Sequence, residues 1–155
     1  MPTDLRTDLR QRKPFASPEQ EAYLNIVRTG TRLVDAFEQL LKPYGISGAQ
    51  YNVLRILRGA EPAGLCRNEL RDRLLTRMPD VTRLLDRMED AGLVTRARDA
   101  ADRRLVTTRI TAQGRRLVDE LDAVTTGEHR RRLGHLSREQ LDTLIELLTL
   151  VRQRL

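Results

Sequence analysis

The spacing of apolar residues changes near residue 93 and changes back near residue 111. Up to Gly92 the apolar residues recur at the spacing of an amphipathic helix. The runs 93–98 and 105–110 have strand length and β-prone residues instead, and the polar stretch 99–104 joins them. Helical spacing then resumes. The chain is therefore predicted to be mainly α-helical, with one small antiparallel β-hairpin.

Three Ser residues mark predicted helix starts. Ser17, Ser47 and Ser137 are each followed three residues later by Gln. This is the pattern of a capping box, in which the two side chains satisfy free N–H groups of the first turn. Pro79 is assigned to the first turn of a further helix, where proline is tolerated. Together with the apolar spacing, these signals predict a short extended piece at 65–66 and helices over 17–41, 47–58, 67–74, about 76–91, 111–136 and 137–155.

The order of these elements is that of a winged helix-turn-helix flanked by N- and C-terminal dimerisation helices. In this fold the second helix of the turn enters the major groove, and the hairpin, or wing, reaches an adjacent groove. The outer helices carry apolar stripes that one chain of this length cannot cover, so we expect a two-fold homodimer. The stripe residues are Leu33, Phe37, Leu121, Leu144 and Leu148. The predicted organisation is a mobile arm at 1–16 and a single domain at 17–155, with the winged helix-turn-helix at about 45–111 and dimerisation helices at about 17–42 and 112–155.

Positive charge is concentrated where the wing is predicted. The chain has 28 Lys+Arg and 22 Asp+Glu, a net charge of +6, and residues 93–116 alone hold seven Arg and two Asp. Arg binds phosphates and guanine edges through a planar fork, so the excess favours double-stranded DNA as the partner. A GC-rich genome is the other explanation for an Arg-rich composition. Aromatic residues make up only 3% of the chain, which leaves few stacking platforms for RNA.

The sequence lacks the patterns of catalytic, metal and cofactor sites. It has no Ser/His/Asp order and no Gly-rich phosphate loop, and its two His residues are too scattered to form a metal site. We therefore expect that the protein is not an enzyme and carries no cofactor or metal. The single Cys, Cys66, is predicted to be a packed core thiol, with an oxidant sensor as the alternative. One Cys, no secretory signal and no long apolar run predict a location in the bacterial cytoplasm, at the nucleoid, away from membranes.

Three motifs in the second half of the chain resemble those of MarR-family transcription regulators. They are the stretch 81–94, which resembles the recognition helix and the strand after it, Asp102-Arg103-Arg104, which resembles the wing tip, and residues 110–114, which resemble the strand-to-helix junction. The resemblance in architecture covers about 17–155. It implies a homodimer on a pseudo-palindromic operator, usually a repressor that a small molecule or oxidant releases.

The resemblance also implies roles for single positions. Asp102 would orient one Arg of the wing in the minor groove, although Ala100 and Ala101 stand where the family commonly has Pro and Arg. Asp80 could accept a hydrogen bond from cytosine or could cap its own helix. With phosphate contacts expected from Arg87, Arg96 and Arg109, the candidate DNA-binding residues are Met78, Asp80, Thr82, Arg83, Arg87, Arg96, Arg103, Arg104 and Arg109.

An effector pocket is implied where the dimerisation helices meet the DNA-binding lobe. A small aromatic or phenolic ligand would suit aromatic walls with a nearby cation. The candidates are Tyr23, Arg32, Tyr44, Gln50 and Tyr51. Ordinary packing at a boundary is the other interpretation of these Tyr residues. A winged helix that binds protein rather than DNA is the alternative function, but it has no need for the Arg density between residues 96 and 109.

Overall fold

The computed structural model describes residues 4–155, so the first three residues of the predicted arm lie outside it. The chain divides into two compact units, Met1–Asn52 and Val53–Leu155, which we describe separately. None of the helices within the described residues is long and apolar enough to cross a membrane.

The first unit is helical. It contains the short α1 (Leu5–Asp8), the long α2 (Pro18–Leu41), the 3₁₀ turn η1 (Lys42–Tyr44) and the start of α3 (Gly48–Gly59). The α1 helix lies within the segment that we predicted to be an arm. Asp8 at its end accepts hydrogen bonds from Arg28 at 3.4 Å and from Arg32 at 3.0 Å.

The predicted helix starts are confirmed. Ser47 and Gln50 form a reciprocal capping box, with the Gln50 N–H 3.2 Å from the Ser47 hydroxyl and the Ser47 N–H 2.9 Å from the Gln50 amide oxygen. Ser137 caps the last helix in the same way. Ser17 caps α2, but its partner Gln20 accepts from the N–H of Ala16 rather than from that of Ser17.

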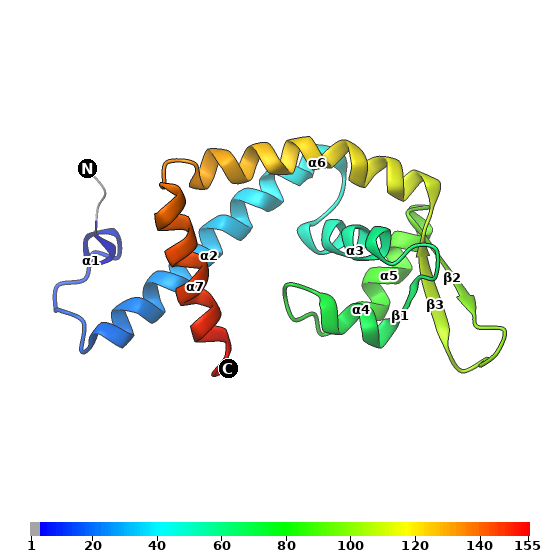
Figure 1. The fold of residues 1–155 in the computed structure, drawn as a ribbon, viewed down its shortest axis with the longest axis horizontal. Coiled ribbons are helices and arrows are strands. Elements are labelled where there is room, and N and C mark those ends of the chain that lie inside the picture. Colours follow the sequence, from blue (N-terminus) through cyan, green and yellow to red (C-terminus); the bar gives the residue numbers. More distant parts are fainter. Residues whose placement is uncertain (1–3) are drawn as a thin grey trace. The chain divides into compact units, whose positions relative to one another are not determined.

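The second unit holds the rest of α3 and the winged-helix elements (Figure 1). A three-stranded antiparallel sheet has the order β1-β3-β2, so that β2 is an edge strand, and the β2–β3 hairpin projects away from α4 and α5. The elements are β1 (Leu65–Cys66), α4 (Arg67–Arg73), α5 (Val81–Asp90), β2 (Val94–Arg98), β3 (Val106–Ile110), α6 (Ala112–Leu133) and α7 (Arg138–Arg152). The predicted fold, mainly helical with a small β wing, is confirmed.

Three predicted boundaries were wrong. Helix α7 ends at Arg152 rather than at residue 155. Helix α5 begins at Val81 rather than near residue 76, because the Asp80 carboxylate caps it by accepting from the N–H of Arg83 at 2.9 Å. Pro79 therefore precedes the helix and does not lie in its first turn. Helix α6 ends at Leu133 rather than at residue 136, with Gly134 as its C-cap.

The core of the second unit is built from aliphatic side chains of α3, α4, α5 and the sheet. The α5 residues Leu84, Leu85 and Met88 are almost completely buried. Leu121 of α6 is also completely buried within the chain. Its assignment to the uncovered dimerisation stripe was therefore wrong, because Leu121 has no exposed surface left for a partner to cover.

The junction between β3 and α6 requires glycine at position 114. Thr111 caps α6 by accepting from the Gly114 N–H at 3.0 Å, and its hydroxyl donates to the carbonyl of Gly92 at 2.7 Å. A Cβ at Gly114 would overlap the carbonyl oxygen of Leu93 and lie 3.0 Å from Cγ1 of Ile110. The helix therefore starts against the backbone that leads into β2.

We expect Gly114→Ala to destabilise the protein by about 1–3 kcal/mol, because backbone atoms cannot move aside as a flexible side chain can. Gly127→Ala in the same helix is the matched control. Its Cβ would meet nothing within 4 Å, so the higher helix propensity of alanine should stabilise the protein by about 0.5–1 kcal/mol. Urea unfolding of both variants at one protein concentration measures the difference. Equal effects of the two substitutions would contradict this account of the junction.

Candidate nucleic-acid interface

Helix α5 has one buried and one exposed face. Val81, Leu84, Leu85 and Met88 are buried. The opposite face presents five exposed side chains, which are Thr82, Arg83, Asp86, Arg87 and Asp90. A helix fixed to the core along one side must present the other side to solvent or to a ligand. In a winged helix-turn-helix this exposed side is the one that can enter the major groove.

The side chain of Asp80 is used as a helix cap. Its carboxylate accepts a hydrogen bond from the N–H of Arg83. The sequence left open whether Asp80 contacts cytosine or caps its own helix, and the structure shows the helix cap. Met78, another predicted DNA-contacting residue, lies half-buried in the segment before α5.

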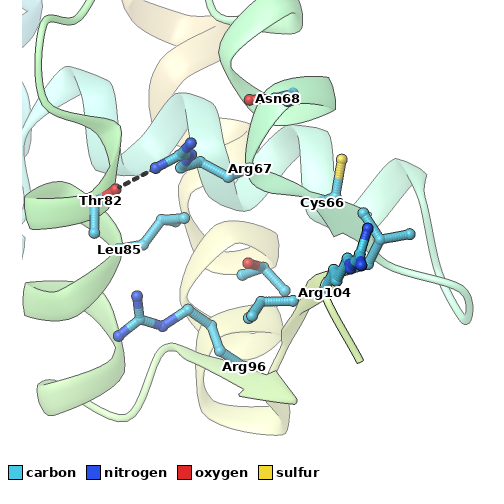
Figure 2. Close-up of a pocket in the computed structure, with 10 residues that line it drawn as sticks. Cys66, Arg67, Asn68, Thr82, Leu85, Arg96 and Arg104 are labelled. Atoms are coloured by element: carbon cyan, nitrogen blue, oxygen red, sulfur yellow. Dashed lines mark hydrogen bonds between the residues drawn. The ribbon is translucent and has the colours of Figure 1, made fainter. Parts of the chain in front are cut away.

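Arg67 is a residue of this surface that the sequence analysis missed. Its Nη1 donates to the Thr82 hydroxyl at 3.2 Å and so connects the start of α4 to the exposed face of α5 (Figure 2). The bond uses the hydroxyl as an acceptor, so Thr82 keeps a donor for a base or a phosphate. No sequence signal predicted this contact, because Arg67 is at the start of one helix and Thr82 lies fifteen residues later in another.

Arg96 of β2 has its guanidinium occupied within the protein. Its Nε and Nη2 donate to Oε2 of Glu89 at 2.9 and 2.7 Å, and its Nη2 lies 2.6 Å from Oδ1 of Asp86. The hydrogen bond with Arg96 holds the pKa of the Glu89 carboxyl below its usual value, and Glu89 in turn raises the pKa of Arg96. The sequence predicted that Arg96 contacts a phosphate. In the structure its guanidinium is paired with the carboxylates of Glu89 and Asp86 instead.

The wing tip is organised by two Asp side chains. The Asp99 carboxylate accepts from the N–H groups of Ala101 and Asp102 at 2.7 and 3.2 Å, and these bonds hold its pKa below the usual value. Asp102 accepts from the backbone N–H of Arg104 at 3.0 Å. Asp102 therefore orients the backbone of the wing Arg pair rather than a guanidinium.

Three candidate Arg side chains remain open to a ligand. Among the described residues, the guanidiniums of Arg83, Arg103 and Arg104 are exposed and form no hydrogen bond or ion pair with the protein. Arg109 of β3 and Arg87 of α5 are exposed as well, but each donates to a backbone carbonyl, to Pro62 at 3.2 Å and to Arg83 at 3.4 Å. These hydrogen-bond partners are neutral, although the charge of Arg109 also acts on the nearby Asp99 carboxylate.

A pocket of about 350 Å³ lies between α5 and the wing (Figure 2). Arg67 and Thr82 form part of one side, and Arg104 and Leu105 of the wing form part of another. The half-exposed Cys66 also lines it. The prediction of a packed core thiol at Cys66 was therefore wrong, because this residue ends the short β1 strand and starts α4 at the surface.

The predicted effector residues lie in the first unit, in different environments. Tyr23 is 65% exposed on α2, and Arg32 is bonded to Asp8. The Tyr51 ring is buried and packs edge-to-face on Phe37, with ring centres 5.5 Å apart. Tyr44 is half-buried in η1, and the Gln50 side chain belongs to the capping box of α3. Packing therefore accounts for Tyr51, and helix capping accounts for Gln50.

Apolar side chains are exposed on two of the outer helices. They are Tyr23, Ile26, Val27, Leu33 and Val34 on α2, and Leu144, Ile145, Leu147, Leu150 and Val151 on α7. Single exposed leucines are ordinary, but helix faces with several large apolar residues are typical of contact surfaces.

Comparison with known proteins identifies the family. The MarR family model matches residues 44–105. The transcriptional regulator FarR of Neisseria gonorrhoeae is 27% identical over 135 residues, which are 87% of this chain and 91% of FarR. The crystal structure of a MarR transcription factor from Planctomyces limnophilus is 40% identical, with a TM-score of 0.68, and covers 88% of this chain and 99% of that one.

A further solved structure is that of S. aureus MepR in complex with DNA. It is 25% identical to this chain, with a TM-score of 0.78, over 86% of this chain and 97% of MepR. FarR is named a transcriptional regulator and the Planctomyces limnophilus protein a MarR transcription factor, and the MepR structure contains DNA. The chain belongs to the MarR family of DNA-binding, winged helix-turn-helix transcription regulators.

Proposed function

We propose that this protein is a sequence-specific homodimeric repressor that binds a pseudo-palindromic operator and is released by a small molecule. The observation that carries the proposal is the exposed face of α5 beside a wing whose tip residues Arg103 and Arg104 have guanidiniums without a partner among the described residues. The crystallised complex of MepR with DNA supports duplex DNA as the partner. A regulator of this kind acts in the bacterial cytoplasm, at the nucleoid.

In this proposal the two DNA-reading elements have different tasks. Thr82 and Arg83 read base edges in the major groove, where an Arg can donate to both O6 and N7 of guanine. Arg103 and Arg104 enter the minor groove, whose potential is most negative where A·T-rich sequence makes it narrow. Met78 and Asp80 lie just before α5 at the edge of the major-groove surface, with Asp80 acting mainly through its cap.

Binding-site selection tests this division directly. Arg83→Ala should relax the base preference at one position in each half-site, a loss of about 1–3 kcal/mol of discrimination. Arg104→Ala should keep that preference and lose the preference for A·T-rich flanks. The half-sites selected by the wild type should lie about one helical turn apart. Identical motifs and flanks for wild type and both variants would contradict the assignment.

Arg87 and Arg109 supply sequence-independent contacts to phosphates in this proposal. Arg87→Ala and Arg109→Ala should each weaken binding to all duplexes alike and reduce the salt slope of binding by about one, since one released counterion is lost per contact. Arg138→Ala is the control, because this Arg pairs with Asp142 on α7 and should leave the slope unchanged. A salt titration of filter binding measures the slopes. A changed sequence preference with an unaltered slope would overturn the assignment.

Dimerisation through the outer helices covers the apolar faces of α2 and α7 in this proposal. Sedimentation of the wild type at micromolar concentration should show a dimer. Ile145→Asp should shift the protein toward monomer, because Ile145 is 61% exposed and a charge there would have to be buried. Glu146→Asp, at the next position, should leave the dimer intact. A wild-type monomer at this concentration would rule out the dimer.

Release by an effector is the last part of the proposal. A small aromatic or phenolic acid would place its ring near Tyr44 and its carboxylate near Arg32. Tyr23 lies near the other end of α2, about 27 Å from Leu41 at about 1.5 Å per residue, so it cannot line the same small site within one chain. Because Arg32 is already bonded to Asp8, such a ligand would have to compete with a carboxylate of the protein itself. Gln50 and Tyr51 would form the supporting wall of this site, since the cap and the ring contact hold them in place.

A further inference from the structure

We infer that Arg96 is a positioning residue that fixes the direction of the wing relative to the recognition helix α5, and that it acts through Glu89 and Asp86 rather than by contacting DNA. This inference rests on DNA recognition by α5 and the wing together. It gives a role to the one predicted phosphate contact whose charge is already matched inside the protein.

The first argument is the contact itself. Arg96 leaves β2 and extends toward α5 (Figure 2), where its guanidinium meets Glu89 at 2.7 Å and Asp86 at 2.6 Å. The side chain of Arg96 is only 22% exposed, whereas those of Asp86 and Glu89 are 51% and 37% exposed. A guanidinium with two carboxylate partners on one helix has little freedom to turn toward a phosphate.

The second argument is the use of the Glu89 carboxylate for the strand as well. Its Oε1 accepts the backbone N–H of Arg96 at 2.9 Å while its Oε2 accepts the guanidinium. Strand β2 is an edge of the sheet and pairs only with β3. Glu89 therefore takes the place of a neighbouring strand at this position, and it fixes both the main chain and the side chain of Arg96 to α5.

The third argument is the position of this clamp, by which we mean Arg96 with Glu89 and Asp86. Only residues 91–93 connect α5 to β2, and Gly92 there has a φ of +72°. The clamp spans this short turn near the base of the wing. Arg104 and Arg103 lie at the far end of the hairpin, four and five residues from Thr108, which pairs with Arg96, and so on the order of 13–17 Å away at the usual rise per strand residue. A small rotation at the base would therefore move the wing Arg pair by several ångströms, which is enough to misalign it with the groove.

The fourth argument is electrostatic. Asp86 and Glu89 lie on the helix that faces DNA, where their negative charges would repel phosphates. Arg96 offsets that repulsion while it stays out of the interface. Arg87 of α5 has no carboxylate partner among the described residues, so Arg87 and Arg96 are expected to respond differently to substitution.

The decisive variant is the charge-neutral double substitution Arg96→Ala/Glu89→Gln, which removes one positive and one negative charge. If Arg96 positions the wing, the double variant should keep the wild-type salt slope and the base preference of α5, lose the A·T preference of the flanks, and bind the operator about tenfold more weakly. Arg87→Ala provides the comparison, with a slope reduced by about one and unchanged flanks. A double variant with a slope reduced by one and unchanged flanks would overturn the inference.

Two single variants make the test independent of any general loss of stability. Lys preserves the charge at a phosphate contact, so the Arg96→Lys variant would bind like wild type if Arg96 touched DNA. If Arg96 positions the wing, this variant should lose the flank preference, because an ammonium group cannot bond two carboxylates as the planar guanidinium does. Glu89→Gln alone should also lose flank preference, whereas tighter binding on removal of this acid would overturn the inference. Failure of the wild type itself to select any duplex would contradict the proposed function, not the role of Arg96.

Discussion

The burial of one face of α5 is the constraint on which the rest of the second unit depends. Val81, Leu84, Leu85 and Met88 anchor the helix in the core, and Asp80 fixes the residue at which it begins. With its rotation and its start determined, the opposite face has to carry Thr82, Arg83, Asp86 and Arg87. The turn at Gly92 then sends the chain directly into β2. Gly114 lets α6 start against the same turn, so the recognition helix and the base of the wing are built on one shared piece of backbone.

The distribution of positive charge is more selective than the composition suggests. Several Arg side chains in the second unit are bonded to carboxylates, such as Arg58 with Asp119 and Asp122, and Arg96 with Glu89. These Arg residues hold elements together. Exposed Arg side chains without a carboxylate partner include Arg83 and Arg87 on α5 and Arg103 and Arg104 on the wing, and also Arg67 on α4, Arg77 before α5 and Arg116 on α6. The total number of Arg side chains therefore overstates how many of them can contact a polyanion.

The elements of the fold could be predicted from local signals. The Ser and Gln capping residues marked three helix starts, and the change of apolar period located the wing, because both depend on neighbours close in sequence. The contacts of the site were harder to predict. The pairing of Arg96 with Glu89 crosses a tight turn, and that of Arg67 with Thr82 spans fifteen residues. Burial of Leu121 and exposure of Cys66 likewise depend on which elements meet in space, and apolar spacing within one helix does not contain that information.

Hydroxyl-radical footprinting of the wild-type protein on its selected duplex tests the central claim most directly, because it reports α5 and the wing in one experiment. Two copies of α5 with their wings should protect two symmetric backbone tracts whose centres lie about one helical turn apart, with further minor-groove protection on the outer side of each tract. A single asymmetric tract, or two tracts without any outer minor-groove protection, would contradict the account.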